Sequence, residues 1–142
     1  MSRLDAVIGR LNAQRSCLNV AVSMIADTPG VILELGLGNG RTFDHLRSSF
    51  PKRNIYVFDR EVASHPDCRP AEDRLFLGPM AETLVIATKQ LGASAALIHA
   101  DIGFGDAAAT ERNVAAIGPL LPDLLCEGGV VFCDQSLDRI AA

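Results

Sequence analysis

A chain of 142 residues with 49% hydrophobic and 21% charged residues has the size and core material of one folded domain, which excludes a disordered protein. Its formal net charge of −4, without a basic stripe, argues against a nucleic-acid partner. No signal-peptide pattern or membrane-spanning apolar run occurs, and the cysteines form no CxxC pair, so we expect a cytoplasmic protein with reduced thiols and no membrane partner.

The first predicted element is a long helix over 4–26, which ends at Thr28-Pro29-Gly30. We expect this helix, within residues 1–29, to pack across the remainder of a single domain that spans 30–142. Apolar side chains recur in it at helical spacing: Leu4, Val7, Ile8, Leu11, Leu18, Val22 and Ile25.

Five short apolar runs then predict buried strands that alternate with helices. Because the runs are continuously apolar, we expect a doubly wound, mostly parallel α/β sheet with helices on both faces. Glu127-Gly128-Gly129 is expected to turn the chain into the last strand. The predicted strands cover 31–35, 54–59, 74–77, 95–101 and 130–134, and the predicted helices cover 41–50, 81–91 and 106–126, the last broken at Pro119 and Pro122.

Three glycines follow the first predicted strand, at the edge where open α/β sheets bind ligands. They allow a tight turn and a close approach of ligand to backbone. Their G-x-G-x-G spacing departs from the dinucleotide fingerprint, which would need glycine where Arg41 stands. Glu34, two residues before the first glycine, would repel a pyrophosphate and attract the ammonium group of an amino-acid ligand. The alternative is a strand-to-helix turn that binds no ligand.

Glu34-x-Gly36-x-Gly38-x-Gly40 resembles the first motif of the class I S-adenosylmethionine-dependent methyltransferases. The resemblance covers about residues 30 to 135 and implies a Rossmann-like sheet of order 3-2-1-4-5. It also implies S-adenosylmethionine as cofactor and methyl transfer to an unidentified small-molecule acceptor, with no catalytic residue assigned. The residues expected to bind the cofactor are Glu34, Gly36, Leu37, Gly38, Asn39, Gly40, Asp59, Arg60, Met80 and Asp101.

Two of these positions carry specific expectations. Asp59 ends the second strand, where the family places the acid that binds the ribose hydroxyls, and the alternative is a turn aspartate. Pro79 stands where the family often has an acid near the adenine, so Met80 is left either to pack on the ring or to join the core.

Acids also end the fourth and fifth predicted strands. Asp101, Asp134 and Gln135 match the places where catechol-type O-methyltransferases hold Mg²⁺, an ion that prefers oxygen ligands. The family usually has Asn in place of Gln135, and no lysine follows Asp101, so strand-end aspartates that cap helices are the alternative. The other acid–base candidates are His45, His65 and His99, the last of which is expected in or near the core.

The chain stops soon after its fifth strand, whereas full members of the family add two strands that help to form the acceptor site. The shortened C-terminus leaves a second function open, a catalytically silent protein that binds S-adenosylmethionine. The last strand, Val130-Val131-Phe132-Cys133, would lie uncharged at an open edge of the sheet. We therefore expect a homodimer through that edge or through the N-terminal helix.

Overall fold

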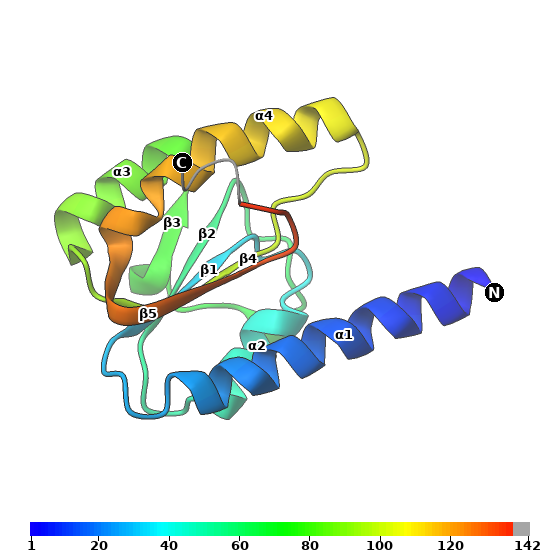
Figure 1. Ribbon diagram of the computed structural model, residues 1–142, viewed down its shortest axis with the longest axis horizontal. Coiled ribbons are helices and arrows are strands. Elements are labelled where there is room, and N and C mark those ends of the chain that lie inside the picture. Colours follow the sequence, from blue (N-terminus) through cyan, green and yellow to red (C-terminus); the bar gives the residue numbers. More distant parts are fainter. Residues whose placement is uncertain (138–142) are drawn as a thin grey trace.

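A computed structural model describes residues 1–137 of the chain and contains a five-stranded parallel sheet of order β3-β2-β1-β4-β5 (Figure 1). This order confirms the predicted Rossmann-like arrangement. Each strand is short and apolar, and parallel neighbours are joined by crossovers that carry helices or irregular segments. The strands are β1 (Val31–Leu35), β2 (Ile55–Asp59), β3 (Leu75–Leu77), β4 (Ala95–Ala100) and β5 (Leu125–Cys133).

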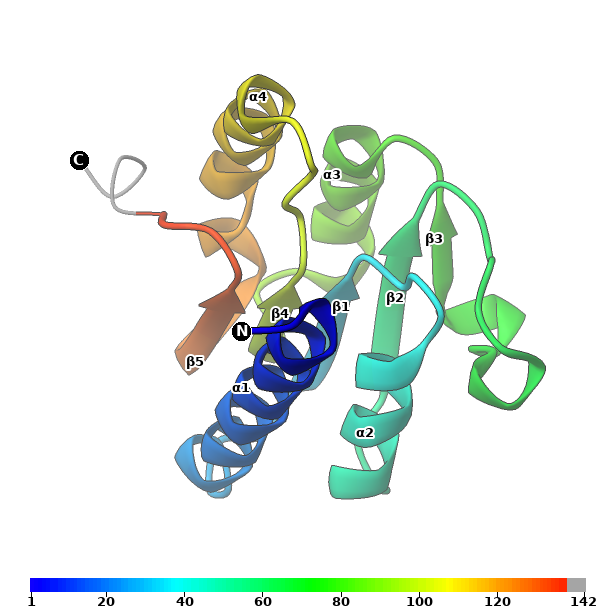
Figure 2. The same ribbon diagram turned by 90° about the vertical axis from the view of Figure 1, so that its right-hand side faces the viewer.

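Helices cover both faces of the sheet. The helices α1 (Arg3–Met24) and α2 (Arg41–Ser49) lie on one face, and α3 (Met80–Leu91) and α4 (Ala107–Ile117) lie on the other (Figure 2). Short 3₁₀ turns complete the connections around the prolines of the chain: Pro66–Cys68, Glu72–Arg74, Gly118–Leu120 and Pro122–Leu124.

The core consists of two layers, because successive side chains of a strand point to opposite faces. Ile32 of β1 packs toward α1 and α2 with Leu18 and Phe43, whereas Leu33 packs toward α3 and α4 with Leu84. Each large apolar side chain that is fully buried contributes about 1.5–3 kcal/mol relative to the exposed state. The sheet that carries the site is therefore held from both sides.

The last strand differs from the prediction, which began it at residue 130. β5 starts at Leu125, and Glu127-Gly128-Gly129 lies inside it as an irregularity rather than before it as a turn. Ala95 pairs with Leu125, and after a shift of register Leu97 pairs with Val130. The prediction was wrong because pairing with β4 holds both sides of the irregularity in the sheet. The predicted break at Pro119 and Pro122 is confirmed by the end of α4 at Ile117.

The first helix packs across the sheet over only part of its length. Ala21 and the following Ile25 are fully buried, but Leu4 is 68% exposed and Ile8 48% exposed. The N-terminal half of α1 extends past the sheet, as Figure 1 shows. A capping box between Ser2 and Asp5 stabilises this projecting end. The apolar stripe of the sequence is therefore covered at one end of α1 and open at the other.

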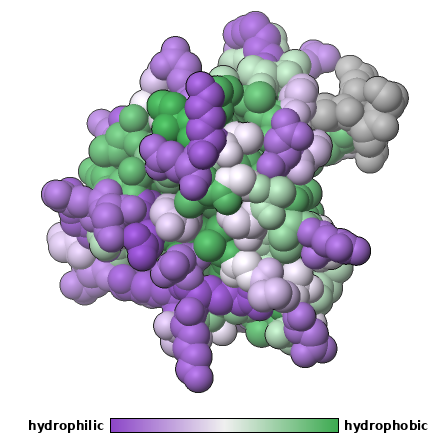
Figure 3. All heavy atoms as spheres, turned by 90° about the vertical axis from the view of Figure 1, so that its left-hand side faces the viewer, coloured by the Kyte–Doolittle hydropathy of each residue, from purple (hydrophilic) through white to green (hydrophobic). Residues whose placement is uncertain are grey.

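The opposite side of the molecule presents a mixed surface. Hydrophilic and hydrophobic residues are interspersed over the face shown in Figure 3, which is the left-hand side of Figure 1. Within residues 1–137, no helix combines the length and the apolar character needed to cross a membrane.

Candidate functional site

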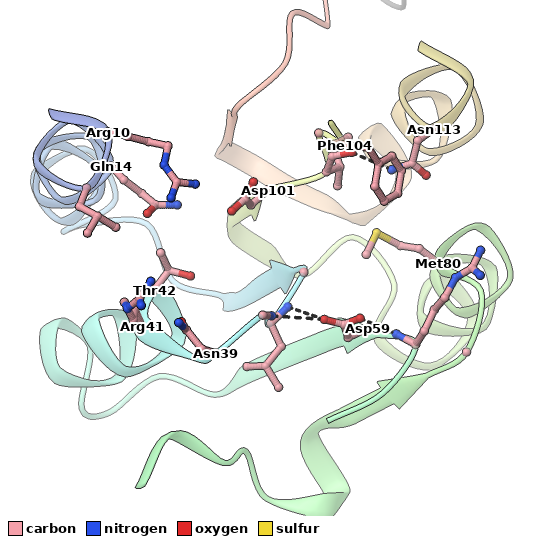
Figure 4. A pocket seen from close by; sticks show the side chains of 18 residues that line it. Arg10, Gln14, Asn39, Arg41, Thr42, Asp59, Met80, Asp101, Phe104 and Asn113 are labelled. Carbon is pink, nitrogen blue, oxygen red and sulfur yellow. Dashed lines mark hydrogen bonds between the residues drawn. The ribbon is translucent and has the colours of Figure 1, made fainter. Parts of the chain in front are cut away.

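A cavity of about 440 Å³ lies at the carboxyl ends of the strands, under the projecting half of α1 (Figure 4). This volume falls in the range of small-molecule sites, which is roughly 300–1,000 Å³. The lining comes from α1, from the loops after β1, β2, β3 and β4, and from α4. The lining residues are Arg10, Leu11, Gln14, Gly36, Leu37, Gly38, Asn39, Arg41, Thr42, Asp59, Arg60, Gly78, Met80, Asp101, Ile102, Gly103, Phe104 and Asn113.

The glycine loop forms one wall of the cavity. Gly36 has a φ of +93°, and a Cβ there would lie 2.6 Å from the carbonyl oxygen of Asp101, so only glycine lets the loop lie against the end of β4. Gly38 has a φ of +52° and no atom within 4 Å of its Cβ position. The backbone of the loop is therefore open to a ligand at Gly38.

Gly40 has a different role. A Cβ at this position would lie 2.6 Å from the Cβ of Cys68, and Gly40 does not line the cavity. Its expected contact with the cofactor is therefore not seen, because the residue packs the loop against the turn at Pro66–Cys68. The glycine spacing correctly predicted a tight turn, and of its glycines Gly36 and Gly38 line the cavity.

Asp59 braces the glycine loop. Its Oδ2 accepts hydrogen bonds from the N–H groups of Leu37 (2.8 Å) and Gly38 (3.4 Å), and its Oδ1 accepts one from the N–H of Arg60 (2.7 Å). A carboxylate has about four acceptor positions, so capacity remains toward the cavity that Asp59 lines. The residue thus joins the ends of β1 and β2 and also faces the ligand space.

Glu34 is fully buried and does not line the cavity. The Nδ1 of His99 lies 2.6 Å from its Oε1, which joins β1 to β4, while its Oε2 has no hydrogen-bond partner within the described residues. The direct attraction expected between Glu34 and the cofactor's ammonium group is therefore not supported, because the side chain is fully buried and paired with His99. The expectation that His99 belongs to the core is confirmed.

The folded state raises the pKa of both members of the Glu34–His99 pair. Burial raises the pKa of Glu34, against the opposing effect of His99. Burial of the His99 ring disfavours its charged form, but the hydrogen bond and the charge of Glu34 outweigh burial and raise the pKa of His99. The pair is a buried structural link between β1 and β4.

Asp134 supports the loop after β4. Its Oδ1 accepts from the N–H of Ile102 (2.9 Å), and its Oδ2 accepts from the N–H of Gly103 (3.0 Å) and from the Nε2 of Gln135 (3.1 Å). Asp101 lines the cavity beside it, and burial, followed by the charge of Asp134, raises the pKa of Asp101. Among residues 1–137, no group of three or more histidine, cysteine, aspartate or glutamate side chains is placed to hold a metal ion.

The two remaining histidines lie away from the cavity. The Nε2 of His45 is 2.9 Å from the Oδ1 of Asn19 and ties α2 to α1, and the Nδ1 of His65 accepts a hydrogen bond from the N–H of Asp67. Neither lines the cavity, so the acid–base role considered for them has no support from the geometry.

Most of the expected cofactor residues meet at the cavity, and α1 adds residues that the sequence did not reveal. The polar Arg10 and Gln14 interrupt the apolar stripe of α1, which is the one signal that could have found them. Phe104 and Asn113 follow β4 without a recognisable motif. The expected residues that line the cavity are Gly36, Leu37, Gly38, Asn39, Asp59, Arg60, Met80 and Asp101.

Comparisons with known proteins agree with this fold. A family model described as S-adenosyl-L-methionine methyltransferase matches residues 1–141. No curated protein matches the chain significantly. The crystal structure of an S-adenosyl-L-methionine methyl transferase from Silicibacter pomeroyi DSS-3 is similar to it at 44% identity and a TM-score of 0.90, covering 96% of this chain and 84% of that one.

More distant structures share the fold. MycE methyltransferase from the mycinamycin biosynthetic pathway, in complex with Mg and SAH, has 20% identity and a TM-score of 0.56. That match covers 94% of this chain and 36% of the other. A second MycE structure, which also contains mycinamycin VI, has 18% identity and a TM-score of 0.59, covering 97% of this chain and 36% of that one.

Proposed function

This chain belongs to the S-adenosyl-L-methionine methyltransferase family, and we propose that it transfers the cofactor's methyl group to a small-molecule acceptor bound beside Asp101. The observation that carries the proposal is one cavity that gathers the glycine loop, Asp59, Met80 and Asp101. Its volume of about 440 Å³ suits a nucleoside cofactor with a small partner better than a macromolecular segment.

The residues of the cavity fit S-adenosylmethionine. The open position at Gly38 gives a ligand access to the backbone, and Asp59 retains acceptor capacity for ribose hydroxyl groups. Met80 and Gly78 line the cavity after β3, so Met80 supplies an apolar contact for the adenine where Pro79 replaces the acid common in the family.

In the proposed mechanism, the chain accelerates the reaction mainly by holding the cofactor and the acceptor in position. When bound, S-adenosylmethionine supplies a methyl group on a positively charged sulfur. The loop after β1 and Asp59 fix the nucleoside, and the wall formed by Phe104 and Asn113 holds the acceptor against it and excludes water. Holding two reactants in line supplies most of the acceleration that such a transfer needs.

The acceptor would bind between two walls of the cavity that come from different parts of the chain. Arg10 and Gln14 approach from α1, Phe104 and Asn113 approach from the opposite side, and Asp101 lies between them (Figure 4). This arrangement supports an enzyme over the silent binder, because Phe104 and Asn113 line space in the cavity that the cofactor residues do not account for. We assign no catalytic base.

A resident magnesium ion does not fit the residues that were expected to bind it. Asp134 directs both carboxylate oxygens at N–H groups, and Gln135 places its amide against Asp134 rather than at the cavity. Of the three expected ligands Asp101 alone lines the cavity, so the set does not gather around one ion there. No step of the proposed reaction therefore depends on Mg²⁺.

We also propose a homodimer in the cytoplasm. β5 lies at an edge of the sheet, and the projecting half of α1 exposes Leu4, Val7 and Ile8, so both features offer surface to a second copy. All four cysteines are free thiols, as expected in a reducing compartment. Light scattering at micromolar concentration tests the assembly, and a monomer mass would contradict it.

The cofactor is tested most directly by thermal unfolding. S-adenosylmethionine and S-adenosylhomocysteine are expected to raise the melting temperature by mass action, whereas NAD and ATP leave it unchanged. Methyl transfer to a panel of phenols and small acids then separates the enzyme from a silent binder. Stabilisation by NAD, with no response to either sulfur nucleoside, would refute the proposal.

A further inference from the structure

The cavity has two chemically different ends. Asp59, Gly78 and Met80 line the end after β2 and β3, where the proposed function places the nucleoside. At the other end, Arg10 from α1 faces Asp101 from the end of β4 (Figure 4). A cation and an anion therefore face the same space, on elements that the sequence places far apart.

These two opposite charges do not neutralise each other by direct contact. Among residues 1–137, Arg10 donates no hydrogen bond, and its interaction with Asp101 is electrostatic, across the cavity. In Figure 4 the Arg10 side chain extends from α1 toward the ligand space rather than away from the body. The guanidinium group is thus presented to whatever occupies the cavity.

Arg41, the neighbouring cation in the cavity wall, is engaged differently. With the amide of Asn39 oriented to satisfy both groups, its oxygen accepts hydrogen bonds from the Nη2 (2.8 Å) and the Nη1 (3.1 Å) of Arg41. Arg41 is therefore occupied within the loop. Of the two cations at this end, Arg10 is the one that donates no hydrogen bond among the described residues.

A ligand whose amino and carboxylate groups share one carbon needs such a pair of opposite charges. Resting on the proposed function, we propose that Arg10, with Gln14 beside it on α1, binds the carboxylate of the cofactor's methionine moiety while Asp101 binds its ammonium group. The planar guanidinium matches a carboxylate with two parallel hydrogen bonds. α1 is then part of the cofactor site and not only a cover over the acceptor.

This assignment also accounts for the position of α1. Leu18, Ala21 and Ile25 anchor the second half of the helix in the core, and this half fixes the direction in which residues 10–14 are held above the strand ends. The first half has no comparable cover. The cofactor's carboxylate would add a contact between α1 and the body at the point where burial of the helix stops.

The experiment compares two ligands that differ only in the carboxylate. Isothermal titration calorimetry measures binding of S-adenosylhomocysteine and of its decarboxylated analogue to the full chain and to the variants R10A and R3A. R10A is expected to weaken binding of S-adenosylhomocysteine roughly tenfold to a hundredfold. The same variant should bind the decarboxylated analogue as the unchanged protein does.

R3A is the matched control, since Arg3 lies on the same helix but outside the cavity lining, and it should alter neither affinity. Equal affinities of R10A and the unchanged protein for S-adenosylhomocysteine would overturn the assignment while leaving the proposed function in place. An equal loss for both ligands would also overturn it. If the unchanged protein bound neither ligand, the proposed function itself would fail.

Discussion

Two aspartates act alike on the two sides of the cavity. Asp59, at the end of β2, accepts hydrogen bonds from the successive N–H groups of Leu37 and Gly38 in the loop after β1. Asp134, after β5, accepts them from two successive N–H groups in the loop after β4. In each case the carboxylate at the end of one strand holds the loop that follows the neighbouring strand nearer the centre of the sheet.

The two loops nevertheless serve different purposes. Asp59 lines the cavity as well as bracing its loop, whereas Asp134 does not reach the cavity and leaves that position to Asp101. The loop after β4 also carries Phe104, which is 61% exposed. An acid at the end of a parallel strand can thus contact a ligand or support the residue that does, and the residue type does not distinguish the two roles.

The largest loss of stability is expected where the Glu34–His99 pair links β1 to β4. H99N removes the partner of Glu34 and leaves a buried carboxylate unpaired, so the free energy of unfolding should fall by about 3–5 kcal/mol. Urea unfolding measures the change. H45N, which alters a half-buried histidine outside the pair whose partner Asn19 is on the protein surface, is the control and should cost about 0.5 kcal/mol or less. A similar small loss in H99N would mean that the pair does not hold β1 to β4.

A comparison of D59A with D134A tests the two braces directly. D59A should weaken binding of S-adenosylhomocysteine by about 1.5–3 kcal/mol, because it removes charge-assisted hydrogen bonds to both the loop and the ligand. D134A should change this affinity little and instead lower stability by about 1 kcal/mol. Calorimetry and urea unfolding measure the two quantities. Equal losses of affinity would show that both aspartates have the same role.

The pH dependence of stability tests the same buried link in the unchanged protein. The folded state raises the pKa of both Glu34 and His99, so it binds more protons than the unfolded chain above the ordinary histidine value of 6.5. The free energy of unfolding should therefore fall as the pH rises from 6 to 8. Urea titrations across this range measure it. A rise in the free energy of unfolding over the same interval would contradict the raised pKa values of the pair.

The smallest effect concerns metal removal. Because Asp134 and Gln135 do not line the cavity, a chelator such as EDTA should leave methyl transfer and binding of S-adenosylhomocysteine unchanged. The comparison is activity before and after chelation, with magnesium added back. A loss of activity that magnesium restores would show that a catalytic metal binds at the ends of β4 and β5. The ends of β4 and β5 would then differ in role from the ends of β1 and β2 more than we expect.

The amino-acid sequence by itself determined the order of elements and one wall of the site. Continuous apolar runs specify buried parallel strands, and glycines at 36, 38 and 40 specify a turn with positive φ, because both depend on local chemistry. Asp59 could be placed at a strand end for the same reason. These features can be predicted without knowing which residues lie on the neighbouring strands.

Only the tertiary structure decided which side chains face one another. The pairing of β1 with β4 put Glu34 against His99, 65 positions apart, and turned an expected ligand contact into a buried link. Packing of α1 brought Arg10 over Asp101 while leaving Leu4 uncovered. Periodicity indicates that a helix has an apolar face, but the point at which that face leaves the core depends on the length of the sheet beneath it, which no local pattern encodes.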